Sequence, residues 1–471
     1  MGLKRKSEKH ELAAKEPINP IFIVTVIVLL AAIATYIVPA GQFDRIPNEV
    51  TGYDMVDVDS FHFVEKNPLP IFSLFTSLTL GLQEASYVIF FLMIIGGTFK
   101  VVDATGALSV GLSNAVVRMK GKELLLIPVS VFLFSTISAF AACSEEYLAF
   151  MPLMYVVCVA AGFDSVTAIA LLFCSSAVGY AGGMTQAFTV GVAQTIAELP
   201  LFSGMGLRVA LFLVLATITS AFLMIRAYRL KKNPELNEMR ETDLRYAEHL
   251  ELEKVPPISG RQKLILAIFA GSFVVVAFTV MKFEFFIDEM SGIFLITGLL
   301  VAVVARMKPS QFIDTFVEGC KDLLFAGLII GMCNSVTLIL TQAGILDTLI
   351  YAAGSLLRGL DARISACGMF VFQDLLNFLI PSGSGQAAIT MPFMAPLSDF
   401  LGVSRQTAVL AFQTGDAFTN AITPTAGDLM AALAICHVPY KKWFKDIAPL
   451  WLLWALVACV FLVIAVSIGY V

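Results

Sequence analysis

Two polar interruptions inside long apolar stretches constrain this sequence more than any other feature. One lies in NFLIPSGSGQAAITMP, from Asn377 to Pro392, and the other in FSTISAFAACSEEYLAFMP, which ends at Pro152. A backbone that leaves the helical conformation at the depth of a bilayer survives only where protein or a water-filled cavity surrounds it. Each interruption therefore indicates a place where something polar is bound.

The two interruptions lie at matching places along the chain. A single offset places Ser144 on Ser384. The same offset places Glu146 on Gln386, and it aligns the flanking sequence GFDSVTAIA with GVSRQTAVL. Interrupted segments at equivalent positions of two halves are the sequence signal for the binding site of a secondary transporter. The sequence therefore predicts a duplicated fold organised around two polar loops.

Composition places the chain in the membrane class. Hydrophobic residues make up 58% of the 471 residues and charged residues only 14%. Apolar runs long enough to cross a bilayer recur along the chain, so we expect an all-α multi-pass membrane protein that contacts lipid. The net charge of −5 indicates no particular partner, and we expect no nucleic acid.

The pattern of spans and charges divides the chain into four parts. We expect a cytoplasmic tail at 1–17, a first membrane repeat at 18–226, a cytoplasmic linker at 227–263 and a second membrane repeat at 264–471. The expected re-entrant hairpins lie at about 124–160 and 364–401, and the expected discontinuous transmembrane helices at about 166–194 and 407–434. In the second repeat we expect an interfacial segment after Pro309, separate from a span at Leu323 to Leu340.

Charge and span number also give an orientation. Basic residues cluster in the N-terminal tail and in the linker, which favours a cytoplasmic N-terminus. An odd number of expected crossings separates the two hairpins, so they open from opposite sides of the membrane. The two repeats are then inverted, and we expect their tips to approach each other near the midplane.

The candidate substrate-binding residues are polar or small residues at the two tips and in the two broken helices. They are Ser144, Glu145, Glu146, Thr185, Gln186, Ser382, Ser384, Gly385, Gln386, Asp416, Asn420, Thr423 and Thr425. Hydroxyl and amide oxygens supply neutral ligands, and small residues let the backbone approach a ligand closely. The alternative for any single Ser or Thr is a hydrogen bond to a carbonyl in its own helix. A Na⁺ site is expected near Ser144, Ser384, Thr185 and Thr425.

Acidic residues inside the membrane give sharper evidence, because a carboxylate there is costly and tends to be functional. Glu145 and Glu146 lie at the first tip, Asp416 and Asp428 flank the second break, and Asp374 lies on a hairpin arm. No Lys or Arg is expected beside them, which indicates Na⁺, a proton or a positively charged substrate group. One of the two glutamates should face the site while the other orients the loop. For Asp374 and Asp428 the alternative is hydration near the interface.

Several other classes of protein find no support in the sequence. There is no GxxxxGK[ST] phosphate loop, and no histidine lies near the serines. We therefore expect neither an ATP-driven pump nor an enzyme that uses a Ser-His pair, and no cofactor apart from a coupling Na⁺ or H⁺. The eight cysteines form no CxxC pair and are interpreted as packing residues.

Three stretches, SEEYLAFMP, NFLIPSGSGQAAITMP and FQTGDAFTNAITPTAG, resemble the YfcC-type carriers. These belong with the anaerobic four-carbon-dicarboxylate carriers and the basic amino acid antiporters of the ion-transporter superfamily. The resemblance implies inverted repeats, each with a re-entrant hairpin and an unwound helix, often in a homodimer in the bacterial inner membrane. Better studied members carry Ser-Asn-Thr at both tips, whereas the tips here read Cys-Ser-Glu and Gly-Ser-Gly.

The residues and the resemblance together predict a secondary active transporter of amino acids. We favour basic ones such as arginine or ornithine, because acids without basic partners line the expected site. Transport would proceed by alternating access, for instance of the elevator type, through exchange or through Na⁺ or H⁺ coupling. The alternative substrate is a four-carbon dicarboxylate, bound by backbone N–H groups and by Ser, Thr and Asn side chains. The alternative from a different functional class is a passive channel, which would need a continuous polar stripe along several spans.

Overall fold

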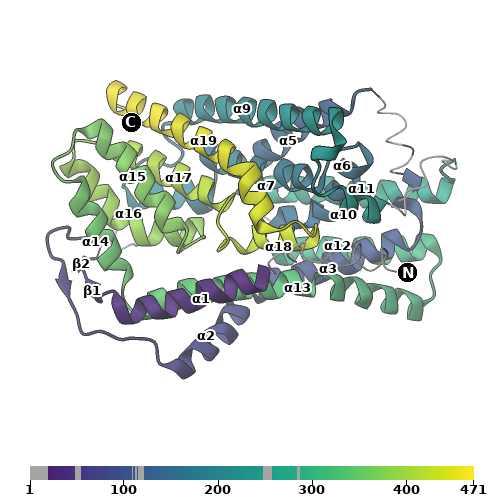
Figure 1. The fold of residues 1–471 in the computed structure, drawn as a ribbon, viewed down its shortest axis with the longest axis horizontal. Coiled ribbons are helices and arrows are strands. Elements are labelled where there is room, and N and C mark those ends of the chain that lie inside the picture. Colours follow the sequence, from purple (N-terminus) through teal and green to yellow (C-terminus); the bar gives the residue numbers. More distant parts are fainter. Residues whose placement is uncertain are drawn as a thin grey trace, which may run out of the picture.

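Helices form nearly all of the regular structure of this chain (Figure 1). The computed structural model describes residues 20–47, 55–108, 110–111, 114, 121–247, 257–283 and 287–471. The expected tail at 1–17 and part of the expected linker, 248–256, lie outside the described residues. The expectation of an all-helical protein is confirmed for the described residues, apart from two very short strand pairs.

The helices up to the linker are α1 (Pro20–Ile37), α2 (Ile71–Glu84), α3 (Ser86–Asp103), η1 (Glu123–Leu125), α5 (Leu126–Ala141), η2 (Glu145–Phe150), α6 (Met151–Ala160), α7 (Ser165–Gly182), the π-helix η3 (Ala187–Gly191), α8 (Val192–Ile196), α9 (Met205–Lys232), η4 (Pro234–Leu236) and α10 (Arg240–Ala247). Those after it are α11 (Gly260–Phe283), α12 (Ile287–Ala305), α13 (Pro309–Gln342), α14 (Leu346–Leu357), α15 (Ala362–Asn377), α16 (Gly383–Phe400), α17 (Arg405–Asn420), α18 (Gly427–Ile435) and α19 (Tyr440–Ile468).

The loop after α1 contains the only strands among the described residues. Strand β1 (Gly41–Gln42) pairs antiparallel with β4 (His62–Phe63), and β2 (Arg45–Ile46) pairs with β3 (Met55–Val56). The sequence did not predict these pairs, because two-residue strands leave no alternating pattern to read.

Seven of the described helices are long and apolar enough to cross a membrane. They are α3, α7, α9, α12, α13, α19 and a helix over Glu123–Phe140 that joins η1 to α5. The chain is therefore a multi-pass membrane protein.

One expected boundary is wrong. Helix α13 runs unbroken through 34 residues, so the expected interfacial segment after Pro309 and the span that follows it form one helix. Proline at the start of a helix leaves no additional N–H unpaired, and it therefore begins α13 without bending it. Glu318 and Asp322 on α13 both pair with α3, because Lys100 Nζ lies 3.0 Å from Glu318 Oε1 and 3.1 Å from Asp322 Oδ2.

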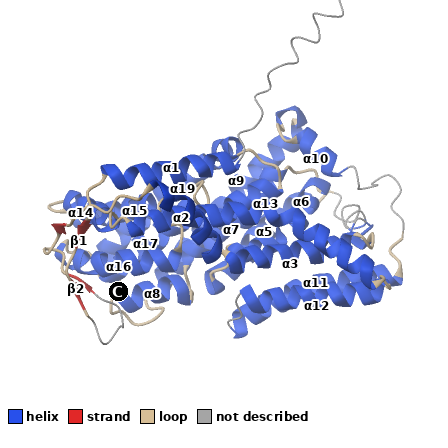
Figure 2. Cartoon of the chain, turned by 90° about the horizontal axis from the view of Figure 1, so that it is seen from below, coloured by secondary structure: helices blue, strands red, loops and turns tan. Residues whose placement is uncertain are grey.

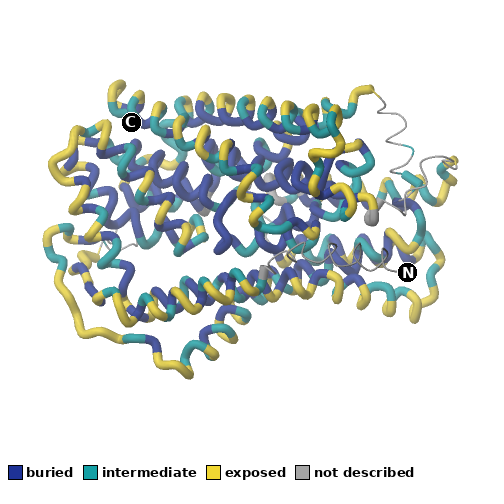
Figure 3. The backbone as a smooth tube through the Cα atoms, in the orientation of Figure 1, coloured by how far each residue is buried: buried dark blue, intermediate teal, exposed yellow. Residues whose placement is uncertain are grey.

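Helices α7 and α17 form the centre of the molecule and contact each other (Figures 1 and 3). Almost every residue of α7 is buried inside the protein, which is unusual even for a membrane span. Helices α5, α6 and α9 pack on α7, while α15, α16 and α19 pack on α17. A second group, in which α13 contacts α1, α2 and α3 and α12 bridges α3 and α11, lies in the lower part of Figure 1, and Figure 2 shows the molecule from below.

Capping interactions fix where both central helices begin and where α7 ends. The Asp164 carboxylate accepts the Thr167 N–H at the start of α7, and Gly183 ends that helix with a φ of 40°. The Ser404 hydroxyl accepts the Thr407 N–H at the start of α17. These caps satisfy N–H and carbonyl groups that the helix ends leave unpaired.

The linker helix α10 docks on the membrane region through one buried acid. Asp243 accepts hydrogen bonds from the Tyr155 hydroxyl at 3.2 Å and from the Ser165 N–H at 3.2 Å. Burial raises the pKa of the Asp243 carboxyl to about 6, although the hydrogen bonds from Ser165 and Tyr155 act in the opposite direction. The start of α7 is thus tied to the short polar helix α10.

Helices α3 and α13 approach each other closely at two glycines. A Cβ atom on Gly319 would lie 2.2 Å from the Gly96 carbonyl oxygen, and a Cβ on Gly96 would lie 2.4 Å from the Gly319 carbonyl oxygen. Small residues at such a crossing let two membrane helices pack backbone against backbone.

We predict that Gly319→Ala destabilises the protein by about 1–3 kcal/mol, because the added methyl group forces α3 and α13 apart. The matched control is Gly292→Ala on α12, where a Cβ meets no atom within 4 Å. The control should be neutral or slightly stabilising, since alanine favours helix more than glycine does. Thermal unfolding of the purified protein in detergent measures both variants. Equal unfolding temperatures for the two would contradict the close crossing.

Candidate functional site

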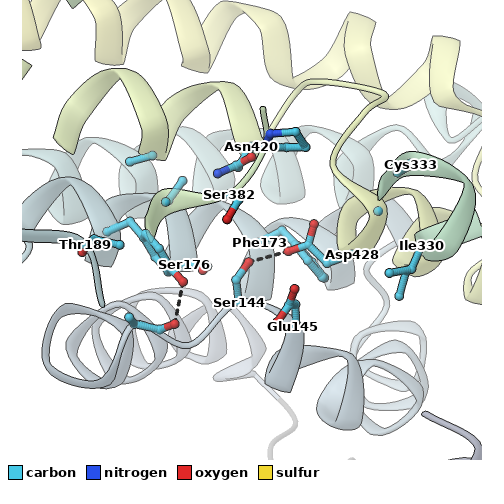
Figure 4. A pocket seen from close by; sticks show the side chains of 18 of the residues that line it. Ser144, Glu145, Phe173, Ser176, Thr189, Ile330, Cys333, Ser382, Asn420 and Asp428 are labelled. Atoms are coloured by element: carbon cyan, nitrogen blue, oxygen red, sulfur yellow. Dashed lines mark hydrogen bonds between the residues drawn. The ribbon is translucent and has the colours of Figure 1, made fainter. Parts of the chain in front are cut away.

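A cavity of about 230 Å³ lies between the loop that follows α5, the start of α16 and the break between α17 and α18 (Figure 4). The predicted residues that line it are Ser144, Glu145, Glu146, Ser382, Ser384, Asn420 and Thr425. The structure therefore brings together residues from both interruptions, which are far apart in the sequence. Helices α3 and α13 complete the wall through Tyr87 and Asn334.

The other predicted residues lie outside the cavity lining. They are Thr185, Gln186, Gly385, Gln386, Asp416 and Thr423. Gln186, Gln386 and Asp416 are fully buried in hydrogen-bond networks behind the wall. Of the four residues expected near a Na⁺ ion, only Thr185 is absent from the lining, and its hydroxyl lies 3.5 Å from the Phe140 carbonyl.

Hydroxyl groups hold the first loop in place. Helix α5 ends at Ala141, and the next residue, Ala142, caps it with a φ of 55°, in the left-handed region. The Tyr180 hydroxyl donates to the Ala142 carbonyl at 2.5 Å. The Cys143 carbonyl accepts from Ser176 Oγ at 2.7 Å and from Ser138 Oγ at 3.0 Å. The carbonyls that the loop removes from the helix are thus paired inside the protein, as an apolar surrounding requires.

The two adjacent glutamates of this loop have different surroundings. One Glu146 carboxylate oxygen accepts the Ser144 N–H at 2.9 Å, so this side chain folds back and fixes the loop. Glu145 is half-buried and faces the cavity (Figure 4). The Ser144 hydroxyl donates to Asp428 Oδ2 at 2.5 Å, which joins the first loop to the start of α18.

The second interruption presents the N-terminal end of α16 to the cavity. The turn itself occupies 378–382, and the sequence GSGQ forms the first turn of the helix rather than the tip of the loop. Ser382 caps this end by accepting the Gly385 N–H at 3.3 Å. A Cβ on Gly383 would lie 2.7 Å from Thr189 Cγ2, so only glycine lets α16 begin this close to η3. The positive end of the helix dipole favours a negatively charged ligand group here.

Glutamines behind the cavity connect the two halves. Gln413 Nε2 on α17 lies 2.8 Å from Gln186 Oε1 and 3.1 Å from Thr189 Oγ1. The Thr189 hydroxyl donates to the same Gln186 oxygen at 2.6 Å. Thr189 itself lines the cavity, so the network ties the cavity wall to the central helices.

The cavity carries an excess of acidic groups. Glu145, Glu146 and Asp428 line it, and no lysine or arginine does so among the residues that the structure describes. The buried Arg208 is used elsewhere, because its guanidinium donates to the carbonyls of Gly183, Ser203 and Phe202. No group of three or more His, Cys, Asp or Glu side chains that could hold a metal ion is found in the described part of the chain.

Sequence reasoning left out several lining residues. Ser176, Tyr180 and Thr189 come from α7 and η3, and Tyr87 and Asn334 come from α3 and α13, outside the stretches in which the two interruptions were aligned. Asp428 was expected to be either a site acid or an interfacial one, and the structure places it in the cavity wall. The signal for Ser176 and Tyr180 was available, because the offset that relates the two loops also places Ser176 on Asp416 and Tyr180 on Asn420.

The fold and the cavity together define a multi-pass membrane protein with a polar chamber enclosed by interrupted helices, which is the class of the membrane carriers. The chain belongs to the C4-dicarboxylate anaerobic carrier family (DcuC), whose model matches residues 19–467. It is therefore a member of a transporter family.

Two curated relatives cover most of the chain. The chain is 31% identical to "Putative basic amino acid antiporter YfcC" of Escherichia coli (strain K12), over 96% of this chain and 97% of that protein. It is 28% identical to an "Uncharacterized protein" of Haemophilus influenzae, over 87% of this chain and 81% of that protein.

Two solved transporter structures show a weaker likeness. One is MtrF of Neisseria gonorrhoeae, described as illuminating a class of antimetabolite efflux pumps, with 16% identity, 97% of both chains covered and a TM-score of 0.43. The other is the YdaH transporter of Alcanivorax borkumensis, with 18% identity, 96% of this chain and 99% of that chain covered, and a TM-score of 0.41.

We predict that Ser144 and Asp428 are energetically coupled. Ser144→Ala and Asp428→Asn should each change the unfolding free energy, and the double variant should change it by less than the sum. The coupling should be about 1–3 kcal/mol, because a hydrogen bond to a charged group is stronger than a neutral one. Denaturation of all four proteins under identical detergent conditions measures it. Additive effects would show that the two residues are independent.

Proposed function

We propose that this protein is a secondary active transporter that carries a basic amino acid, such as arginine or ornithine, by alternating access. The observation that carries this proposal is the charge of the cavity. Three acidic side chains line it without a lysine or arginine among the described lining residues. A positively charged substrate would supply the missing charge, since unpaired acids within a membrane protein are costly.

The cavity offers a separate place for each end of such a substrate. Glu145 and Asp428, from the first loop and the start of α18, would hold the positively charged groups. Ser382, Ser384 and the N-terminal end of α16, from the second interruption, would hold the α-carboxylate through hydroxyl and N–H groups. A zwitterion with an additional positive charge would therefore satisfy both groups of residues. The name of the Escherichia coli relative is consistent with this substrate class.

We also propose the arrangement of the chain in the membrane. Helices α5 and α6 with η2 would form one re-entrant hairpin, and α15 with α16 the other. Helices α7 with α8 and α17 with α18 would be the discontinuous helices of two inverted repeats at 18–226 and 264–471. The linker at 227–263 and the tail at 1–17 would lie in the cytoplasm, with the protein in the bacterial inner membrane as a homodimer.

Two features support this arrangement. Each proposed repeat has a helix, a non-helical turn, a second helix and then a helix broken by polar residues, in the same order. The two turns also meet at one cavity, as inverted hairpins would. Movement of one group of helices against the other, as in an elevator, would then expose the cavity to either side. Exchange, or coupling to Na⁺ or H⁺, would drive transport.

A four-carbon dicarboxylate is a second candidate substrate. The family is described as that of a C4-dicarboxylate anaerobic carrier. Ser382, Ser384 and the start of α16 could bind one carboxylate of such a molecule. Its other carboxylate would lie beside Glu145 and Asp428, where like charges repel each other. We therefore place this substrate second.

Exchange in proteoliposomes tests the substrate and the role of Glu145. Vesicles loaded with arginine should take up labelled arginine and ornithine, but not labelled succinate. Glu145→Gln should raise the KM for arginine about tenfold or more, because a charged hydrogen bond contributes about 1.5–3 kcal/mol.

The matched control for this exchange assay is Glu84→Gln, which changes an exposed glutamate at the end of α2 and should leave the KM unchanged. Uptake of succinate into vesicles loaded with succinate, without arginine exchange, would favour the second candidate. An unchanged KM in Glu145→Gln would remove this glutamate from the site.

Thiol labelling tests the inverted topology at two equivalent glycines. Gly162 and Gly402 both lie in exposed turns with positive φ, so a cysteine strains each turn alike. In a variant whose native cysteines are replaced by serine, a membrane-impermeant maleimide should label Gly402→Cys in intact cells. It should label Gly162→Cys only after the cells are permeabilised. Labelling of both from the same side would exclude inverted repeats.

A further inference from the structure

A group of unpaired oxygen atoms lies directly behind the wall of the cavity. Asp416 on α17 is fully buried, and its Oδ2 atom has no hydrogen-bond partner among the described residues. Two more buried acceptors in the same part of the structure, Asn377 Oδ1 and Asn420 Oδ1, also have no partner there. Unpaired buried acceptors are costly, and a bound ion or polar ligand is one way in which native proteins satisfy them.

The three side chains are held together by hydrogen bonds. Asp416 Oδ1 accepts from Asn377 Nδ2 at 2.8 Å and from Asn420 Nδ2 at 3.4 Å. Both amide groups therefore present their nitrogen atoms to one carboxylate oxygen and leave their own oxygen atoms unpaired. The result is one carboxylate oxygen and two amide oxygens, none of which accepts a hydrogen bond from the described residues.

A chain of amides fixes this orientation. Asn377 Nδ2 also donates to Gln386 Oε1 at 2.8 Å. Gln386 Nε2 in turn donates to the carbonyl and the side-chain oxygen of Gln373, at 2.8 and 2.7 Å. Rotating the Asn377 amide by 180° would place its oxygen against two acceptors at once. Asn377 Oδ1 is thus the atom that remains available to a ligand.

The site is next to the cavity rather than isolated from it. Asn420 lines the cavity and also contacts Asp416. Gly383, another lining residue, runs so close to Asp416 that a Cβ there would lie 3.1 Å from Oδ2. Asp416 therefore lies against two residues that also line the cavity. Figure 4 shows Asn420 on the cavity side, above Ser382.

The chemistry of the donors favours a monovalent metal cation. Hard oxygen donors without sulfur or imidazole suit alkali and alkaline-earth ions. A single carboxylate supplies one negative charge, which balances Na⁺ but leaves a divalent ion half-neutralised. The described residues also contain no cluster of three or more acidic, histidine or cysteine side chains that would hold a divalent ion.

We propose that Asp416, Asn377 and Asn420 bind a monovalent metal cation, with Na⁺ as the ion to test, in the wall of the cavity. Because Asn420 belongs to both sites and Gly383, which lines the cavity, lies against Asp416, the ion would order the wall against which the substrate binds. That coupling to the substrate rests on the proposed function, whereas binding of the ion does not. Two bound ligands that order the same residues favour each other.

A thermal-shift titration of the full-length protein in detergent tests the ion site without any substrate. NaCl is exchanged for choline chloride at constant total chloride, so that ionic strength does not change. The unfolding temperature should rise with Na⁺ and reach a plateau, as binding to the folded state requires. Asp416→Asn should abolish the rise, or increase the half-saturating Na⁺ concentration at least about tenfold.

The matched control is Asp374→Asn on α15. Asp374 is equally enclosed by helices, but its carboxylate accepts a hydrogen bond from the Thr419 hydroxyl at 2.5 Å and takes no part in the site. This variant should keep the response to Na⁺. If Asp416→Asn does not fold, Asn420→Asp provides the test, since a second carboxylate at the site should add a response to Ca²⁺ that the natural protein lacks.

Two other outcomes of the titration would contradict the proposed ion site. A response to pH with none to Na⁺ would assign Asp416 to a proton and overturn the metal site. A response to Na⁺ that survives in Asp416→Asn would place the ion elsewhere. Repeating the titration with arginine separates the two proposals. A Na⁺ response without an arginine response would leave the ion site in place and contradict the proposed substrate.

Discussion

A chain that leaves the helical conformation inside a bilayer must pair its exposed carbonyl and N–H groups within the protein. The first loop does so with hydroxyl groups, because Tyr180 and Ser176 donate to the carbonyls of Ala142 and Cys143. The second does so with the Ser382 cap at the start of α16. The side chains that stabilise these interruptions also form the cavity, so the stability of the loops and the binding of a ligand depend on the same contacts.

The negative charge of the cavity lining determines which kind of ligand the cavity favours. Glu145 and Asp428 line a space that has no lysine or arginine from the described residues, and the start of α16 lines it as well. A ligand with separated positive and negative groups is matched by such a space, whereas a ligand with two negative groups is matched only in part. The acid behind the wall, Asp416, adds a place for a small cation next to the substrate. Substrate and ion would then be coupled through residues that both sites share, and not through a change transmitted over a distance.

Much of this organisation could be predicted from the sequence, because polar residues inside apolar stretches have few uses other than binding and capping. The joint position of Ser144 and Ser382 at one cavity followed from the duplicated pattern. The direction in which a buried amide points did not follow from that pattern, since the Gln386 side chain fits either a cavity wall or a hydrogen-bond network behind it. The continuity of α13 was also missed, since the pairing of its Glu318 and Asp322 with Lys100, which is distant in sequence, is visible only in the structure.

The most direct test of the account is an experimental structure of the purified protein at saturating arginine, determined by electron cryomicroscopy. The account predicts ligand density inside the cavity, with the guanidinium group beside Glu145 and the carboxylate at the start of α16. Ligand density outside the cavity, or an arginine carboxylate placed against Glu145, would contradict it.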